Sequence, residues 1–231
     1  MAERLRKLGI VMMVLGVVFA GVGVYALMEV QAGNSSLQAF SEAQGVMLSY
    51  NDDGELIDRG QTEGALAIRS LLEDDWGFAV DEGDFDPADP LVNTATEYMY
   101  QMATIGYHIM HGTQTVVLTE DKEYEGEVFA AGTYEFEVDG RYWTDFNRSH
   151  PIEGPARSQA WSGTSHGLFG ELGVGTVTAS TLQLANGVAL LVFGLGMTIL
   201  LLGVGLYWVA KGKEDDHLPV MADTKPEPVI V

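Results

Sequence analysis

The sequence has no cysteine among its 231 residues. This absence excludes disulfide bonds, thiolate metal sites, cysteine nucleophiles and lipidation through cysteine. Basic residues are also scarce, because 12 Lys and Arg stand against 33 Asp and Glu and give a formal net charge of −21. Nucleic acids are bound through clustered Lys and Arg, so this balance argues against a nucleic-acid-binding protein.

Charge is missing altogether from two apolar stretches near the ends of the chain. Residues 8–28 and 188–210 form runs of 21 and 23 residues without a charged side chain. About 20 apolar helical residues span the hydrocarbon core of a bilayer. A soluble core helix of this length would carry a polar face, which both stretches lack. We therefore predict a membrane protein with two transmembrane helices.

The first stretch must be weighed against a secretory signal peptide. It is longer than the roughly 7–15 apolar residues of a signal peptide. The one small-residue cleavage pattern, Val30-Gln31-Ala32, comes late, and no cysteine follows to make a lipoprotein. We interpret residues 8–28 as an uncleaved anchor.

Basic residues mark the outer ends of both stretches: Arg4, Arg6 and Lys7 precede the first, and Lys211 and Lys213 follow the second. The inner ends have no Lys or Arg nearby. The positive-inside rule therefore places both termini in the cytoplasm and residues 29–187 outside the plasma membrane. We expect residues 1–7 to be a short cytoplasmic N-terminus and residues 211–231 a disordered cytoplasmic tail.

The acidity belongs to the segment between the two predicted spans. Residues 29–187 hold 27 acidic and six basic residues, and the two chain ends hold six of each. Only one of the six bases between the spans is a lysine, Lys122. The net charge therefore describes the predicted outer domain and indicates a hydrated surface.

Small residues recur every seven positions in both predicted spans: Gly9, Gly16 and Gly23 in the first, Ala189, Gly196, Gly203 and Ala210 in the second, with Gly187 and Gly194 on a second row. Such a repeat keeps one face turned toward a partner in a left-handed crossing, and small side chains let backbones approach closely. The seam could join the two helices of one chain or two subunits. Neither span contains an ionisable residue, which argues against a channel or a pump.

The segment between the spans predicts an α+β domain of hairpins and helices. Asp-Gly between apolar runs predicts a hairpin at residues 45–58, and helical periodicity predicts helices at 63–74 and 91–111. The second helix should bury a stripe of Val92, Ala95, Met99, Met102, Gly106 and Ile109. We also expect strands at 115–119 and 124–138 with a turn at 130–133, an Asp139-Gly140 hairpin leading into 141–144, a helix at 156–172, and helical extensions of the spans at 35–44 and 176–186.

An acidic loop gathers five carboxylates within nine residues: Asp81, Glu82, Asp84, Asp86 and Asp89. Several oxygens held in a turn can bind a hard cation such as Ca²⁺. The spacing lacks the alternating acids, central glycine and late glutamate of an EF-hand. We favour an exposed acidic loop, and we keep a Ca²⁺ site at Asp81, Asp84, Asp86 and Asp89 as an alternative.

His108 and His111 stand three residues apart, so a helix would place both rings on one face. Together with His150 or His166 they could form a metal or proton site, although no His-Glu-x-x-His pattern is present. A packed or exposed polar face is the simpler interpretation. Tyr100, Thr104 and Tyr107 lie on the same side and could instead form an aromatic docking surface.

No motif nominates a catalytic centre. The sequence has no Walker loop and no dinucleotide-binding fingerprint after a predicted strand. Residues 163–167, Gly-Thr-Ser-His-Gly, have the letters of Gly-x-Ser-x-Gly, but a serine beside a histidine in the sequence is no evidence of a catalytic triad. We therefore predict no catalytic and no cofactor-binding residue.

The layout resembles a group of small actinobacterial two-span membrane proteins of unknown role. These have a basic start, one span, an outer domain and a closing helix preceded by Thr-Ala-Ser, as Thr178-Ala179-Ser180 stands before residues 188–210 here. His108 or His111 stands where the group often has a histidine after a helix. Some members carry an aromatic ring-opening dioxygenase label, for which this chain offers no metal-ligand arrangement. Low lysine content and heavy acidity would also suit a haloarchaeal origin.

These features predict a non-enzymatic integral membrane protein that serves as an accessory or assembly subunit of an envelope or membrane complex. The expected partners are the lipid bilayer and a membrane protein or a second copy, bound through Gly9, Gly16, Gly23 and Ala189, Gly196, Gly203. No nucleic acid is expected. The alternative function is a cation- or small-ligand-binding sensor domain on a two-helix anchor.

Overall fold

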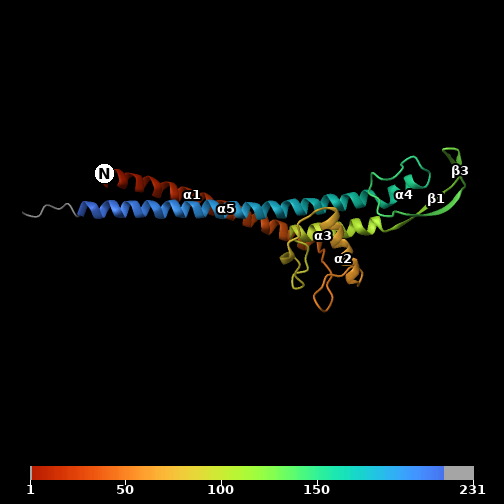
Figure 1. The fold of residues 1–231 in the computed structure, drawn as a ribbon, viewed down its shortest axis with the longest axis horizontal. Coiled ribbons are helices and arrows are strands. Elements are labelled where there is room, and N and C mark those ends of the chain that lie inside the picture. Colours follow the sequence, from red (N-terminus) through yellow and green to blue (C-terminus); the bar gives the residue numbers. More distant parts are fainter. Residues whose placement is uncertain (1, 216–231) are drawn as a thin grey trace, which may run out of the picture. The chain divides into compact units, whose positions relative to one another are not determined.

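The structure is a computed structural model that describes residues 2–215 (Figure 1). The chain folds into two compact units. The first, which we call the helix pair, comprises Met1–Ala32 and Gln183–Val231, and the second, the central unit, comprises Gly33–Leu182. The described elements are α1 Ala2–Gln44, α2 Thr62–Ser70, the π turn η1 Leu71–Asp75, the 3₁₀ turn η2 Glu82–Asp84, α3 Ala95–Met110, β1 Thr113–Leu118, β2 Lys122–Tyr124, β3 Glu127–Phe129, β4 Gly132–Glu137, α4 Glu153–Ala160 and α5 Gly163–Asp215.

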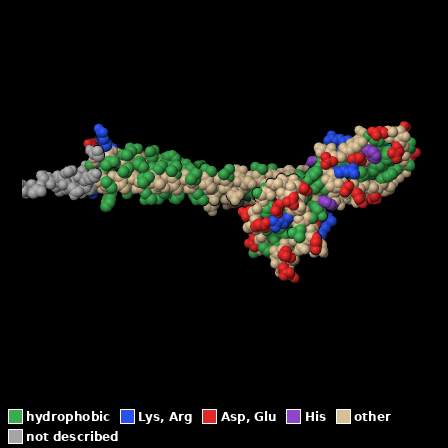
Figure 2. Space-filling view, viewed as in Figure 1, with side chains coloured by type: hydrophobic (Ala, Val, Ile, Leu, Met, Phe, Trp, Pro, Cys, Tyr) green, Lys and Arg blue, Asp and Glu red, His purple; other side chains and the backbone are tan. Residues whose placement is uncertain are grey.

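Helices α1 and α5 are both long and apolar enough to cross a membrane, by length and composition. Each runs well beyond its apolar stretch, which confirms the helical extensions predicted at residues 35–44 and 176–186. Figure 2 shows apolar side chains over the helix pair and carboxylates gathered on the central unit. The predicted tail at 211–231 begins within α5, and residues 216–231 lie outside the described part of the chain.

The small residues spaced seven apart are the contact face of the helix pair. Gly9, Gly16 and Gly23 are buried in α1, and their counterparts on α5 are Ala189, Gly196, Gly203 and Ala210. A Cβ atom on Gly16 would lie 2.5 Å from the Leu200 nitrogen, and one on Gly23 would lie 2.6 Å from the Phe193 nitrogen. The two backbones therefore touch within one chain. Around the second row, Gly187 and Gly194, no described atom approaches a Cβ position within 4 Å.

Helix α3 begins at Ala95, and the start predicted at residue 91 is wrong. Thr94 forms a capping box: its hydroxyl accepts from the Glu97 nitrogen at 3.2 Å, and the Glu97 carboxylate accepts from the Thr94 nitrogen at 2.9 Å. The same carboxylate accepts from the Asn93 nitrogen at 3.0 Å. These bonds satisfy N–H groups that the first turn of a helix leaves without partners, and they set its first residue.

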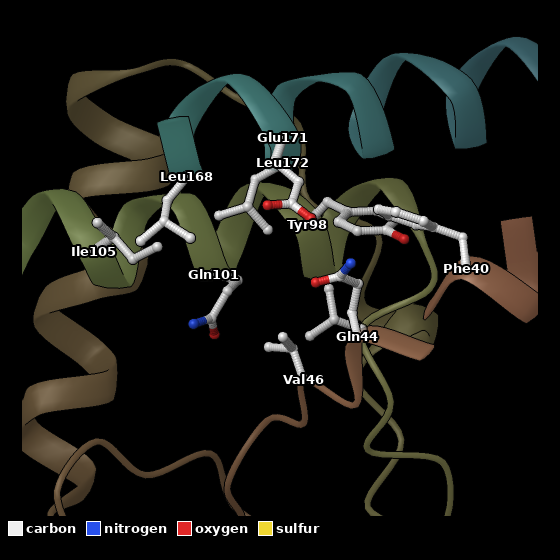
Figure 3. A pocket seen from close by; sticks show the side chains of 10 residues that line it. Phe40, Gln44, Val46, Tyr98, Gln101, Ile105, Leu168, Glu171 and Leu172 are labelled. Atoms are coloured by element: carbon white, nitrogen blue, oxygen red, sulfur yellow. The ribbon is translucent and has the colours of Figure 1, made fainter. Parts of the chain in front are cut away.

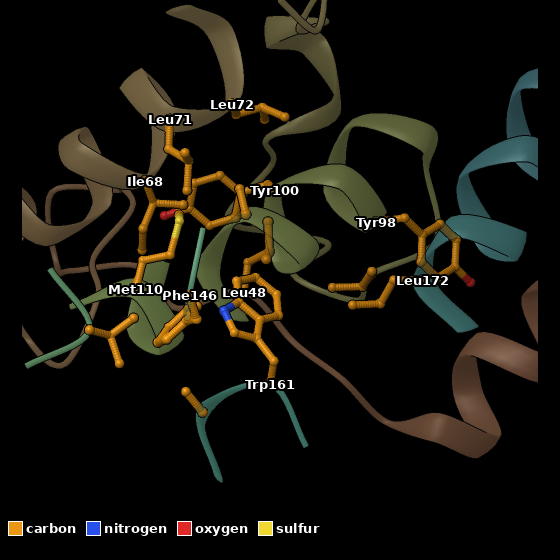
Figure 4. Packing of buried hydrophobic residues seen from close by; sticks show 14 residues of the cluster. Leu48, Ile68, Leu71, Leu72, Tyr98, Tyr100, Met110, Phe146, Trp161 and Leu172 are labelled. Carbon is orange, nitrogen blue, oxygen red and sulfur yellow. The ribbon is translucent and has the colours of Figure 1, made fainter. Parts of the chain in front are cut away.

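The burial stripe predicted for this helix is confirmed at Val92 and Gly106 and wrong at its other four positions, which are only partly buried, and no residue of α3 is exposed. The buried positions are Thr96, Glu97, Tyr98, Tyr100, Ala103, Gly106 and Met110. Most of the predicted stripe residues pack against the same core but are only partly buried. Tyr100 is only 4% exposed and lies in the core with Ile68, Leu71 and Met110 (Figure 4). The alternative of an aromatic docking surface is therefore wrong for Tyr100.

The predicted hairpin at 45–58 is present as a turn with little strand. Asn51 donates its backbone N–H to the Glu55 carbonyl at 2.9 Å, and Tyr50 and Leu56 form an isolated antiparallel bridge. The next predicted helix begins at Thr62, as expected, and its last turn, Leu71–Asp75, widens into a π turn.

The turn predicted within 124–138 at 130–133 is confirmed in part, because β3 ends at Phe129 and β4 begins at Gly132. A second turn was not predicted: Glu125 and Gly126 have positive φ of 52° and 87° and follow the end of β2 at Tyr124. The turn joins β2 to β3, and β1 pairs antiparallel with β4 from Thr113↔Glu137 to Leu118↔Gly132. Asp139 and Gly140 also turn with positive φ, but residues 141–144 form no strand. Two consecutive positive φ angles are typical of the tight turns of hairpins.

The predicted helix at 156–172 is interrupted. Helix α4 ends at Ala160, and α5 begins at Gly163, where the Ser162 hydroxyl accepts from the Ser165 nitrogen at 3.2 Å. This serine therefore acts as the N-cap that starts the long helix. Helix α4 packs on the β1–β4 ribbon in a small core of Val116, Leu118, Ile152 and Ala156.

Replacing Gly16 with Leu should push the two helices of the pair apart, because its Cβ position already meets backbone. Gly21→Leu is the matched control, since nothing lies within 4 Å of the Gly21 position. The chain lacks cysteine, so spin labels can be placed at Val24→Cys and Leu190→Cys, both exposed. We expect the interlabel distance to grow by about 2 Å, the usual range between small and large helix contacts. Equal distances in both variants would contradict the backbone contact.

Replacing Glu97 with Gln tests the buried carboxylate of the capping box. Burial raises the pKa of Glu97 above its ordinary value, although the N–H groups of Asn93 and Thr94 oppose the rise. Ionisation of Glu97 therefore opposes folding, a cost that is absent below the unfolded pKa of about 4.3 and complete above the folded one. A glutamine keeps the oxygen acceptor without the charge.

The stability of Glu97→Gln relative to the parent chain should therefore rise as the pH is raised from about 4 through the folded pKa, by about 1.4 kcal/mol for each unit of raised pKa. Thermal unfolding of the full chain in mild detergent measures this difference. A difference that stays constant, or that falls as the pH rises, would show that the carboxylate is not penalised.

Candidate functional site

The central unit contains an apolar cavity of about 70 Å³ where the last turns of its α1 segment, α3 and the first turns of α5 meet (Figure 3). The loop residues Val46 and Val92 complete its wall. The remaining lining residues come from the three helices: Phe40, Gln44, Tyr98, Gln101, Ile105, Leu168, Glu171 and Leu172. The cavity is therefore built by segments from widely separated parts of the sequence.

Tyr98 holds the three helices of the cavity together. Its hydroxyl forms a hydrogen bond of 2.7 Å with the Ser41 hydroxyl of α1, and both side chains are buried. Its ring lies against the backbone of Gly175 on α5, where a Cβ atom would come within 2.6 Å of the ring. Gly33 makes a second close approach, because its Cβ position lies 2.5 Å from Leu182. Glycine at these positions lets α1 and α3 approach α5 closely.

The chemistry of the cavity suits binding. Its walls are mostly apolar, and the polar side chains around it are the amides of Gln44 and Gln101 and the carboxylate of Glu171 (Figure 3). Phe40 and Leu168 are 40% and 39% exposed, so two of the apolar lining residues reach solvent. Pockets of this kind use apolar walls for affinity and a few polar groups for orientation. The volume of the cavity, about 70 Å³, fits one apolar side chain.

The predicted acidic loop is organised by its own backbone. Asp81 accepts from the Gly83 nitrogen at 3.0 Å, Asp86 accepts from the Ala88 nitrogen at 2.8 Å, and Asp89 accepts from the Asn93 amide at 3.4 Å. Asp84 lies in the 3₁₀ turn η2. In the described residues no three His, Asp or Glu side chains are grouped so that they could hold a metal ion. Ca²⁺ binding at this loop stays a prediction.

The two predicted histidines have different partners. His108 Nε2–H donates to the Asp58 carboxylate at 2.9 Å and so ties α3 to the turn before α2. His111 Nδ1–H donates to the Tyr107 carbonyl at 2.9 Å, and its ring lies 4.1 Å from the Tyr107 ring. Asp58 could not be predicted as a partner, because it lies 50 residues from His108.

The other two histidines that we considered with them have local roles. His150 Nδ1 accepts from the backbone nitrogens of Ile152 and Glu153, both at 3.2 Å, and so caps α4. His166 Nδ1–H donates to the Ser162 carbonyl at 2.9 Å. Each imidazole is thus oriented by a neighbour in its own segment.

Two buried phenols were missed by the sequence patterns. The hydroxyls of Tyr50 and Tyr100 are buried, and no described residue gives either one a hydrogen bond. Burial, and then the nearby Glu97 carboxylate, raises the pKa of Tyr50 to about 12. Burial also raises the pKa of Tyr100, with the Asp58 charge adding to the effect. Both side chains are therefore neutral phenols at physiological pH.

No protein-family model, curated protein or solved structure matches this chain. The resemblance to actinobacterial two-span proteins stays a prediction.

Replacing Gly175 with Ala should damage the cavity wall, because the new Cβ would strike the Tyr98 ring. We expect a loss of stability of about 1–3 kcal/mol from overpacking, partly offset by about 1 kcal/mol of helix propensity. Gly170→Ala is the matched control on the same helix, since nothing lies within 4 Å of that position, and it should stabilise the chain. Thermal unfolding of both variants measures the contrast, and equal effects would contradict this packing.

Proposed function

We propose that this chain is a plasma-membrane protein with two spans and both termini in the cytoplasm. In this proposal the central unit lies outside and acts as a non-catalytic docking subunit of a membrane or envelope complex. The observation that carries the proposal is the partly open apolar cavity, with Phe40 and Leu168 exposed among its lining residues. The expected occupant is one apolar side chain of a partner protein.

The helix pair supports the role of an anchor. Its buried face is made of glycine and alanine, and residues 8–28 and 188–210 contain no ionisable side chain. Close backbone contact lets helices associate in lipid without polar groups. A proton or ion pathway needs ionisable or strongly polar groups within the membrane. The helix pair is therefore better suited to anchor the central unit in a membrane than to conduct protons or ions.

The surface charge supports a partner with basic residues. The segment 29–187 holds 27 acidic and six basic residues, and Glu171 lies at the cavity itself. Complementary charge steers association and excludes partners of like charge. The docked segment should therefore present an aliphatic or aromatic side chain next to Lys or Arg.

A photo-crosslinker at Leu168 tests the docking role in native membranes. We expect a discrete cross-linked product, whereas the same crosslinker at Leu66, an exposed leucine on α2 outside the cavity, should give none. Filling the cavity with Ile105→Phe should lower the yield at least about fivefold, which corresponds to about 1 kcal/mol of docking free energy.

Ile109→Phe is the matched control, because Ile109 lies on the same helix but not in the cavity wall. Phe40→Asp, at an exposed lining residue, should have the same effect as Ile105→Phe without a change in the core. Equal products at Leu168 and Leu66, or a clean monomer after purification in mild detergent, would refute the docking role.

A further inference from the structure

Arg157 is a buried arginine without a carboxylate partner. Its side chain is only 8% exposed, its Nε–H donates to the Trp143 carbonyl at 3.0 Å, and its guanidinium carbon lies 3.0 Å from the centre of the Trp143 ring. Within the described part of the chain, neither terminal nitrogen has a hydrogen-bond partner, and no Asp or Glu lies within ion-pair distance. These nitrogens are not among the fully buried polar atoms without a partner, so they reach solvent and are free to donate to an anion.

The neighbours of Arg157 are themselves cationic or can become so. The Arg148 guanidinium lies 5.7 Å from the centre of the same Trp143 ring. Burial, and then the charge of Arg148, lowers the pKa of Arg157. The His166 ring lies edge-on to Trp143, with 4.8 Å between ring centres. Its Nδ1–H is used by the Ser162 carbonyl, which leaves Nε2 without a partner among the described residues. Two guanidinium groups therefore lie near one tryptophan, beside a histidine whose Nε2 can donate to an anion when its ring is protonated.

Three of the six bases of the central unit have carboxylate partners. Arg69 pairs with Glu73 and Glu82, Lys122 pairs with Glu120, and Arg141 pairs with Glu153. Among the described residues Arg148 and Arg157 form no ion pair, although the segment 29–187 has 27 acidic residues. Arg59, on an exposed turn, forms none either, but Arg148 and Arg157 differ from it because both lie near one tryptophan ring.

The backbone around Arg148 is held firmly in place. Gly154 packs against it so closely that a Cβ atom would lie 2.5 Å from the Arg148 carbonyl oxygen. The Glu153 carboxylate accepts from the Asn147 nitrogen at 2.8 Å, and His150 caps the start of α4. Arg148 therefore lies in an ordered turn that precedes α4, the helix that carries Arg157.

We propose that Arg148, Arg157 and His166, arranged around Trp143, bind a small oxyanion of the phosphate class. A guanidinium presents a fork of N–H donors that matches the oxygens of phosphate, and two such groups with an imidazole suit a doubly charged anion. The site shares no residue with the apolar cavity. It is independent of the proposed docking function and of membrane orientation.

Tryptophan fluorescence of the full chain in non-ionic detergent tests the site, because Trp143 contacts both arginines. Inorganic phosphate, titrated at constant ionic strength against chloride, should give a saturable change that Trp143→Phe removes. Arg148→Gln, an exposed position, should weaken the apparent Kd at least about tenfold, the usual effect of losing a charged hydrogen bond. Arg59→Gln removes the same charge from an exposed turn elsewhere and should leave the Kd unchanged.

Arg157→Lys keeps the positive charge but loses the planar set of N–H donors of the guanidinium, so it should also weaken phosphate binding. Nanodiscs of phosphatidylcholine with and without phosphatidic acid distinguish a lipid headgroup from a free phosphate. A signal from phosphatidic acid that inorganic phosphate reverses would identify the headgroup, and a signal from inorganic phosphate alone would identify a soluble ligand. The proposal is overturned if neither form gives a saturable change, or if Arg148→Gln and Arg157→Lys leave that change intact.

Discussion

The central unit depends on the burial of α3 along its whole length. Every element around this helix is fixed by a contact with it: Tyr98 meets Ser41 of α1 and Gly175 of α5, Gly106 leaves room for Trp76 and Phe169, and His108 holds the turn at Asp58. Because the helix has no face of its own toward solvent, none of its neighbours can shift without opening the core. The apolar cavity lies in this arrangement, at a place where three helices meet but do not quite fill the space.

The parts of the fold that depend on local chemistry could be predicted from the sequence. The two apolar helices, their glycines at every seventh position, the start of α2 at Thr62 and the turn at Asn51 all follow from signals within a few residues. The burial of α3 beyond its apolar stripe could not be predicted, because polar and aromatic residues such as Glu97, Tyr98 and Tyr100 are buried by contacts with distant segments that periodicity does not mark. The turn at Glu125 and Gly126 was missed for a different reason: the alternation expected of a strand continues through it from Tyr124 to Val128, and only the backbone angles reveal it.

The candidate sites could not be predicted from the sequence, because each brings together residues that lie far apart along the chain. The cavity combines Phe40 with Tyr98 and Leu168, and no pattern in the sequence relates these three. Asp58 and His108 form a pair across 50 residues. The sequence patterns instead indicated candidate metal sites at the acidic loop and at the two histidines three residues apart, because these residues are close together along the chain. In the structure their side chains mostly bond to nearby backbone or to Asp58.

The net charge of −21 argues against binding of a polyanion such as a nucleic acid, but not against binding of a single small anion. A nucleic acid presents a long row of phosphates and needs a basic surface of similar extent, which this chain lacks. A single phosphate needs only two or three donors at one point, and their local balance decides whether it binds. Around Trp143 that balance favours an anion, because Arg148 and Arg157 form no ion pair within the described residues while Arg69, Lys122 and Arg141 each form one. Composition therefore argues against a polyanion, and it leaves room for a small anion where two arginines without an ion pair lie near one ring.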